Sequence, residues 1–224
     1  GSEMCIRDRV NTAQWLEVME TAHELGFKTT ATIMYGHVEK PIHWARHLLR
    51  VRDLQARTGG FTEFVPLPFV HMEAPMYLKG KARKGPTFRE AVLMHAVSRL
   101  VLHGQIDNIQ TSWVKMGHEG VKACLNAGSN DLGGTLMNES ISRAAGTLHG
   151  QETTPNEMNT IIHQLNRNAR QRNTLYSNVS KERVAQGLRR IELAEIVNTP
   201  AKKYERKAAK LSLIHISEPT RRPI

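Results

Sequence analysis

Residues 27–69, FKTTATIMYGHVEKPIHWARHLLRVRDLQARTGGFTEFVPLPF, decide the fold of this chain. The stretch Phe27–Tyr35 is rich in β-branched residues, which favour a strand. Pro41 suits the first turn of a helix, and the pair Gly59–Gly60 suits its end. A second strand-like run, Thr62–Leu67, follows at once. Strand, helix and strand in this order predict two parallel strands joined by a right-handed crossover.

Helical patterns flank this unit on both sides. Asn11 or Thr12 can cap a helix that ends at Gly26. Its expected packed face consists of Trp15, Leu16, Met19, Ala22 and His23. For the helix that begins at Pro41, the residues at helical spacing are Ile42, Ala45, Leu48, Leu49 and Arg52. Thr87 and Glu90 form a capping box for a helix over Phe88–His103.

The rest of the chain continues the alternation. Pro66, Pro68 and Pro75 are expected to exclude helix from the loop after the second strand. Further elements are expected in the order strand, helix, strand, helix and helix, over Ile109–Val114, Glu119–Leu125, Asp131–Leu136, Ser140–Ala145 and Asn156–Leu165. A last helix is expected over 181–197.

The alternation of strands and helices predicts an α/β fold with parallel strands. A doubly wound sheet and a (β/α) barrel both satisfy this pattern. A whole barrel takes about 250 residues and eight strands, whereas this chain has four expected strands and begins on a helix. We therefore predict the C-terminal half of a (β/α) TIM-type barrel over 10–180, of about four parallel strand–helix units, with a basic helical extension over 181–210.

The two ends share no periodicity with their neighbours. Residues 1–9, GSEMCIRDR, and 211–224, LSLIHISEPTRRPI, resemble translated sequencing adapters. We interpret both as non-native, adapter-derived segments; ordinary frayed termini are the alternative. On the first interpretation the chain is a window of a longer protein whose gene continues upstream of Val10.

Composition excludes several classes of protein. The net charge is +10, but 181–210 alone carry nine basic and four acidic residues, so the excess is not a focused nucleic-acid-binding stripe. No run of about 20 apolar residues and no secretory leader are present, so we expect a cytoplasmic protein without a membrane or nucleic-acid partner. The two cysteines, Cys5 and Cys124, cannot supply four thiolates to an iron–sulfur site.

Polar and small residues follow each expected strand. In a barrel the carboxyl ends of all strands open onto one face, where the chemistry takes place. After the first two strands the group is Tyr35, Gly36, His37, Glu39, Phe69, His71 and Glu73. After the third and fourth it is Gln110, Ser112, Trp113, Lys115, Asn130, Asp131, Gly133, Gly134, Thr135 and Glu139.

Several of these residues have a plainer interpretation. His37 could brace its loop, the glycines at 133 and 134 could serve a tight turn, and Lys115 could be a surface lysine rather than a Schiff-base lysine. His43 and His47 stand four apart on one helix, but the glutamate and third ligand of a zinc motif are missing. We assign no metal ligand and expect Cys124 to lie in the core.

Two long strings in this chain resemble a known family. TATIMYGHVEKPIHWARHLLRVRDLQARTGGFTEFVPLPFVHMEAPMY and NIQTSWVKMGHEGVKACLNAGSNDLGGTLMNESISRAAGTLHG are similar to the tyrosine-coupling part of the FO synthase family, which belongs to the radical S-adenosylmethionine (SAM) enzymes. The likeness runs from about residue 11 to about 180. MYGHVE, FTEFVPLPF, QTSWVK and NDLGGT occur together in it.

The resemblance implies an enzyme of deazaflavin coenzyme biosynthesis. In this family a 4Fe-4S cluster, held by three cysteines, reduces S-adenosyl-L-methionine to a radical that fragments L-tyrosine. The 4-hydroxybenzyl unit then joins 5-amino-6-(D-ribitylamino)uracil, and a partner domain or subunit closes the ring. The three-cysteine loop is absent from this chain, so we expect the chain alone to be inactive.

The residues expected to face the lumen and contact cofactor or substrate are His37, Glu39, Gln110, Asn130, Asp131 and Thr135. No catalytic role is assigned to any of them. Two other hypotheses remain open: a menaquinone-pathway radical SAM enzyme of the same superfamily, and a basic binding protein without enzymatic activity.

Overall fold

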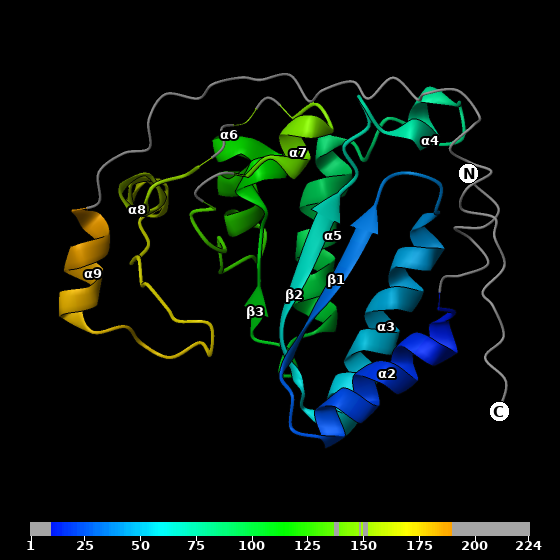
Figure 1. Ribbon diagram of the computed structural model, residues 1–224, viewed down its shortest axis with the longest axis horizontal. Coiled ribbons are helices and arrows are strands. Elements are labelled where there is room, and N and C mark those ends of the chain that lie inside the picture. Colours follow the sequence, from blue (N-terminus) through cyan, green and yellow to red (C-terminus); the bar gives the residue numbers. More distant parts are fainter. Residues whose placement is uncertain (1–9, 137–138, 148, 150–151, 190–224) are drawn as a thin grey trace, which may run out of the picture. The chain divides into compact units, whose positions relative to one another are not determined.

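The computed structural model describes residues 10–136, 139–147, 149 and 152–189. The chain divides into two units, Gly1–Leu193 and Ala194–Ile224, and every described residue lies in the first. The described elements follow one another as helices and strands along the chain (Figure 1). They are α2 (Thr12–Glu24), β1 (Thr29–Tyr35), α3 (Pro41–Thr58), β2 (Phe61–Pro68), α4 (Pro75–Leu78), α5 (Phe88–Val101), β3 (Asn108–Ile109), α6 (Trp113–Asn126), α7 (Ile141–Ala144), α8 (Pro155–Gln164) and α9 (Lys181–Leu188).

The strands form a parallel sheet in the order β1-β2-β3. β1 pairs with β2 along its whole length, with one extra residue in β2 at Thr62. A single parallel bridge between Gln110 and Asp131 continues the sheet beyond β3. The predicted α/β class with parallel strands is therefore confirmed.

The third and fourth strands are shorter than predicted. β3 ends at Ile109, and the chain turns into α6 at Trp113 instead of staying extended to Val114. The expected strand over Asp131–Leu136 is reduced to its first residue, because Gly133 and Leu136 both have left-handed backbone angles (φ 71° and 48°). A left-handed residue ends the extended path that a strand requires.

The predicted helices are present, with three corrections. α6 begins earlier than Glu119 and is kinked at Gly117, whose φ of 64° breaks the helix into two parts. Pro75 does not exclude helix but begins α4, since its missing N–H costs nothing in a first turn. The packed side of α3 is centred on Leu48, Val51 and Leu54, whereas most of the expected side, such as Ile42 and Leu49, is exposed.

The helix boundaries agree with their local signals. Asn11 caps α2 and Thr87 caps α5, each through a reciprocal capping box. α5 ends at Val101, two residues before the expected end. Within the described residues α9 ends at Leu188, and the rest of the helix predicted over 181–197 lies outside them.

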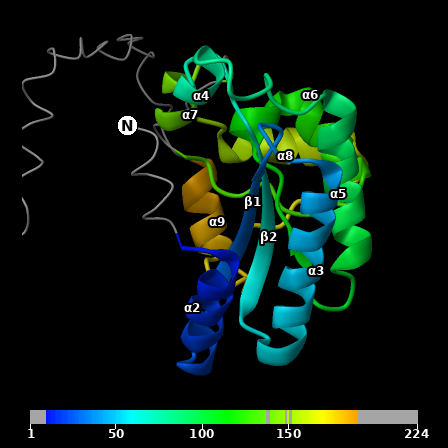
Figure 2. The same cartoon turned by 90° about the vertical axis from the view of Figure 1, so that its right-hand side faces the viewer.

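One face of the sheet packs against helices and forms the main core. Figure 2 shows α3 and α5 along one side of β1 and β2. The side chains of Ala31, Ile33 and Tyr35 alternate along β1 and are buried on this side. Trp15 and Leu16 of α2 pack against the same cluster. A second apolar cluster joins α6 to α8.

The opposite face of β1 is open among the described residues. Thr30, Thr32 and Met34 alternate with the buried positions and are exposed, Met34 to 53%. The register places Val65 of β2 beside Thr32 on this same face. We call this side of the sheet the inner face.

No helix of the described residues is long and apolar enough to cross a membrane.

His23 joins α2 to the first strand–helix unit. Its Nδ1 lies 2.6 Å from Thr58 Oγ1 and its Nε2 lies 2.7 Å from Thr29 Oγ1. The ring covers Gly60 so closely that a Cβ atom there would lie 2.0 Å from the imidazole. The Gly60 position therefore depends on the absence of a side chain.

Replacement of Gly60 by alanine is expected to lower the free energy of unfolding by about 1–3 kcal/mol, because the new methyl group displaces the His23 ring. Urea unfolding followed by circular dichroism measures the change. Gly134→Ala is the matched control, since nothing lies within 4 Å of a Cβ at that position. An unfolding midpoint for Gly60→Ala equal to that of the unchanged chain would contradict this packing.

Acid is expected to destabilise the fold through His95 of α5, which is fully buried and lies 3.4 Å from the Cys124 thiol of α6. Burial lowers its pKa from 6.5, although its hydrogen bond to the Ala91 carbonyl opposes the shift. Below about pH 6.5 the unfolded chain therefore binds a proton that the folded chain does not, and stability falls by up to about 1.4 kcal/mol per pH unit. Unfolding midpoints between about pH 7.5 and 5.5 test this. His95→Gln should flatten the profile, and an unchanged slope would count against it.

Candidate active site at the carboxyl ends of the strands

The loop after β1 is organised by Glu39. Its carboxylate accepts hydrogen bonds from the backbone N–H groups of Gly36, His37 and Val38 and from Trp44 Nε1. His37 Nδ1 lies 2.6 Å from Glu39 Oε2. Successive N–H groups that converge on one carboxylate form an anion-binding concavity, here filled by the chain itself. Glu39 therefore holds the loop that presents His37.

Electrostatics keep Glu39 ionised. Burial by itself would raise the pKa of this carboxyl, but the hydrogen bonds from Gly36, Trp44 and His37 outweigh burial and lower the pKa to about 2. The side chain is 13% exposed. Glu39 is thus a fixed negative charge at neutral pH rather than a group that exchanges protons.

The loop after β2 lies beside the loop after β1. The rings of His37 and Phe69 are 5.5 Å apart, and the His71 ring meets Tyr77 of α4 edge-on at 4.6 Å. The first two groups of polar residues predicted from the sequence are thus adjacent at the end of the sheet to which β1 and β2 point (Figure 1).

Gln110 and Asp131 lie side by side through their parallel bridge. Asp131 Oδ1 accepts a hydrogen bond of 2.6 Å from the N–H of Gly133, and the Gln110 amide packs where a side chain at Gly133 would be. The turn at Gly133 therefore follows from these contacts rather than from a bound anion. Both residues were predicted individually as site residues, and the structure places them side by side.

Arg172 covers Asp131 from a segment far along the chain. Its Nε donates to Asp131 Oδ2 and its Nη2 donates to Asp131 Oδ1 at 3.0 Å. Nη2 also lies 3.6 Å from Glu63 Oε2. Thr30 of β1 donates to the other oxygen of Glu63 at 3.0 Å. The guanidinium thus joins two strand positions, Asp131 and Glu63, and Glu63 links them to Thr30 on the inner face.

Tyr176 completes this cluster. The Arg172 guanidinium lies 4.1 Å from the centre of the Tyr176 ring, and Tyr176 itself has a left-handed φ of 64°. Burial first, and then its hydrogen bond to Glu63, raises the pKa of the Tyr176 hydroxyl. We refer to Thr30, Glu63, Asp131, Arg172 and Tyr176 as the inner-face cluster.

Asn130 and Thr135 lie elsewhere. The Asn130 side chain accepts from the Ile109 N–H and from Arg99, and donates to the Asp107 carbonyl, at the beginning of β3. Thr135 accepts a hydrogen bond through its carbonyl from the Thr153 N–H. Neither residue contacts His37 or Glu39. The contacts of Asn130 tie α5 to the sheet.

A further group forms where α6 begins. Lys115 Nζ lies 3.5 Å from Ser142 Oγ of α7, and Glu139 Oε1 accepts the Ser142 N–H at 2.9 Å. Trp113 Nε1 donates to the Gly134 carbonyl, which joins the third and fourth polar loops. Lys115 and Glu139 were each predicted at strand ends, but the contact with Ser142 was not.

The remaining candidates have structural roles. His43 Nδ1 accepts the Lys40 N–H at the start of α3, so it caps that helix. Cys124 is fully buried, as predicted, and burial raises the pKa of its thiol to about 11 although a hydrogen bond with Thr111 opposes this. In the described part of the chain no three His, Cys, Asp or Glu residues are grouped as metal ligands would be.

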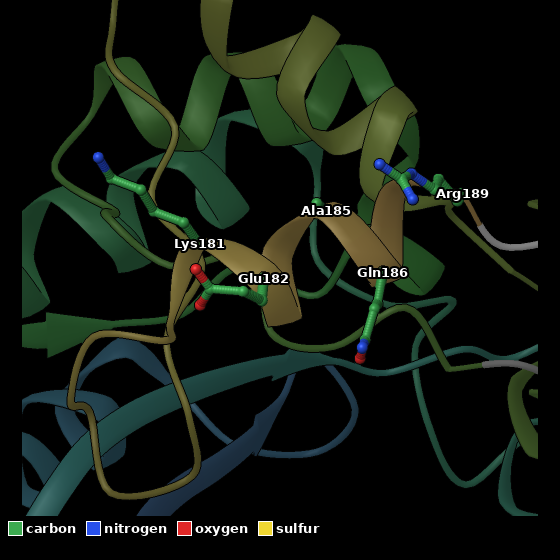
Figure 3. A pocket seen from close by; sticks show the side chains of 5 residues that line it. All are labelled: Lys181, Glu182, Ala185, Gln186 and Arg189. Carbon is green, nitrogen blue, oxygen red and sulfur yellow. The ribbon is translucent and has the colours of Figure 1, made fainter.

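A 4Fe-4S cluster does not fit these residues. Cluster ligands are thiolates, whereas the single described cysteine is buried with a raised thiol pKa. Figure 3 shows a pocket lined by Lys181, Glu182, Ala185, Gln186 and Arg189 of the α9 region. It contains none of the residues at the strand ends, and its charged side chains are exposed. We do not take this pocket for the active site.

The parallel strand–helix units carry polar loops at the carboxyl ends of their strands. This is the architecture of α/β proteins that bind ligands or substrates at the carboxyl ends of parallel strands. A family model described as the CofH/MqnC C-terminal region matches residues 58–184. This is more than half of the chain, and the chain belongs to that family.

Named relatives agree with this family. An FO synthase of Mycobacterium leprae (strain TN) is 54% identical over 171 residues, which cover 76% of this chain and 20% of the relative. An FO synthase of Streptomyces coelicolor is 51% identical over 177 residues, 79% of this chain and 20% of the relative.

An archaeal relative is shorter. The 5-amino-6-(D-ribitylamino)uracil–L-tyrosine 4-hydroxyphenyl transferase of Methanothermobacter thermautotrophicus is 46% identical over 171 residues, which are 76% of this chain and 47% of the relative. The chain thus spans about a fifth of the FO synthases and about half of this transferase.

Glu39→Ala is expected to loosen the loop after β1 and to cost about 2 kcal/mol, because several N–H donors lose a charged acceptor. Its folded pKa of about 2 lies below the ordinary 4.5, so this contribution is complete above about pH 5 and is lost as the pH falls toward 2. Hydrogen exchange of residues 36–44 measures the loosening.

Asp53→Ala is the matched control for this experiment, since Asp53 is an exposed carboxylate on α3 whose one ion-pair partner among the described residues is Arg52. Glu39→Gln should give an intermediate result. Equal exchange in the alanine variant and the unchanged chain would show that Glu39 does not organise the loop.

Proposed function

We propose that this chain is the carboxyl-terminal part of an enzyme of FO biosynthesis, which couples the 4-hydroxybenzyl unit of L-tyrosine to 5-amino-6-(D-ribitylamino)uracil. The observation that carries this proposal is the 46% identity to a transferase named for those two compounds, over 76% of this chain. The identity to FO synthases of 50% or more over a similar stretch supports it.

We further propose that the described sheet is the second half of a (β/α) TIM-type barrel. The exposed, alternating side chains of β1 on the inner face are what the lumen side of a barrel strand presents. Within the part of the chain that the structure describes, β1 has a free edge, and a preceding strand would pair there. The ligands of a 4Fe-4S cluster would then come from chain outside the described residues.

Within this proposal the predicted site residues divide into two groups. His37, Gln110 and Thr135 remain proposed contacts for cofactor or substrate. Glu39 and Asp131 are engaged by other residues of the chain, so we propose that they position the loops around the site, whereas Asn130 ties α5 to the beginning of β3 and is no longer proposed as a contact. A ring-closing domain or subunit is the proposed partner, and the cytoplasm is the proposed location.

A menaquinone-pathway enzyme of the same superfamily is the alternative. The matched family model joins CofH and MqnC in one description, so it does not separate the two. The names of the relatives at about half identity favour FO biosynthesis. The acceptor that the enzyme uses decides between the two pathways.

A chimera tests the proposed function. Residues 10–189 of this chain replace the matched segment of the archaeal transferase, and the reconstituted enzyme is supplied with SAM, a reductant, L-tyrosine and the ribitylaminouracil. We expect the coupled product by mass spectrometry from the chimera and none from the chain alone. The unchanged transferase is the positive control. A chimera that cleaves SAM but forms no coupled product would contradict the proposal, as would product formation by the chain alone.

A further inference from the structure

Lys115, Ser142 and Glu139 meet where the third and fourth strand units end. Lys115 lies in the first turn of α6, and Ser142 lies in α7. Figure 1 places α7 beside the beginning of α6, at the end of the sheet to which the strands point. These three side chains therefore belong to the edge where a parallel sheet binds its ligands.

Ser142 lies between a cation and an anion. Its hydroxyl is 3.5 Å from Lys115 Nζ, and its N–H donates to Glu139 Oε1 at 2.9 Å. Lys115 and Glu139 form no direct ion pair among the described contacts. Ser142 is 7% exposed, so the serine separates the two charges within a partly enclosed region.

The second oxygen of Glu139 is left without a partner. Oε2 is buried and accepts no hydrogen bond among the described residues. A buried carboxylate oxygen without a donor is costly, so such an oxygen in a native fold calls for an explanation. Lys115 likewise has an ammonium group with three donors, and Ser142 occupies at most one of them.

An α-amino acid carries the complementary pair of charges. Its ammonium group donates to a carboxylate such as that of Glu139, and its carboxylate accepts from an ammonium such as that of Lys115. Burial lowers the pKa of Lys115 and the nearby Glu139 opposes that shift, so a bound carboxylate would further favour the charged amine.

We propose that Lys115 and Glu139, separated by Ser142, form the subsite for the α-carboxylate and α-ammonium groups of an amino-acid substrate. The identification of that amino acid as L-tyrosine rests on the proposed function. Lys115 Nζ donates to the carboxylate of the ligand, and Glu139 Oε2 accepts from its ammonium group. Neither residue is assigned a proton-transfer role.

Three probes separate the two halves of this subsite. L-tyrosine has both charged groups, tyramine lacks the carboxylate, and 3-(4-hydroxyphenyl)propionate lacks the amine. Binding of each probe to the full 224-residue chain is measured by ligand-observed NMR titration. L-tyrosine is expected to bind about tenfold or more tightly than either analogue, because each missing charge leaves a buried partner unpaired.

The variants should act on different ends of the ligand. Lys115→Met is expected to weaken L-tyrosine about tenfold or more and to leave tyramine unchanged, because tyramine has no carboxylate to lose. Glu139→Gln is expected to weaken L-tyrosine and to leave 3-(4-hydroxyphenyl)propionate unchanged. Lys122→Met is the matched control, since Lys122 also lies on α6 but pairs with Glu119 at 2.7 Å.

Equal weakening of all three probes by a variant would indicate a structural role and overturn the proposal. So would unchanged binding in both variants, or no binding of any probe to the folded chain. The chimera separates this proposal from the proposed function. If the chimera makes the coupled product but Lys115→Met and Glu139→Gln leave the selectivity among the probes unchanged, the proposed subsite is wrong and the proposed function stands. If the chain binds the probes selectively but the chimera makes no coupled product, the proposed function is wrong and the amino-acid subsite stands.

Discussion

The parallel pairing of β1 with β2 is the constraint on which the rest of the described structure depends. Parallel neighbours need a crossover, and α3 supplies it along one face of the sheet. That face buries Ala31, Ile33 and Tyr35, while the opposite face keeps Thr32 and Met34 exposed. Both strands also end at the same edge, so the loops that carry His37 and Phe69 become neighbours although more than thirty residues separate them.

The inner-face cluster gives the sheet a second constraint. Arg172 neutralises Asp131 and approaches Glu63, so a late segment of the chain lies against strand positions that the helices do not cover. A bidentate guanidinium–carboxylate pair fixes orientation as well as charge. The segment around Arg172 therefore defines the inner face near the start of the strands, and leaves their carboxyl ends to the polar loops.

Local signals in the sequence predicted the helices and strands better than they predicted the contacts between these elements. The caps at Asn11 and Thr87 act within four residues, so they could be recognised directly. The prediction of a fourth strand over Asp131–Leu136 was wrong, because the Asp131 side chain accepts a hydrogen bond from the Gly133 N–H and the chain turns there. The pairing of Asp131 with Arg172 spans 41 residues and has no local signature. Glu63, the one charged residue of β2, was the available sign of the inner-face cluster.

Accessibility of the inner face to a reagent shows whether another part of the protein covers it. Thr32→Cys, in a chain with Cys5→Ser, places a thiol on this face, whereas the remaining Cys124 is buried. The rate of thiol labelling is measured for the chain alone and for the chain within the chimera, with the Cys5→Ser chain as background. We expect rapid labelling in the chain alone and strong protection when the other half of the barrel is present. Slow labelling in the isolated chain, or equal rates in both, would contradict the claim that this face lines a lumen completed by another part of the protein.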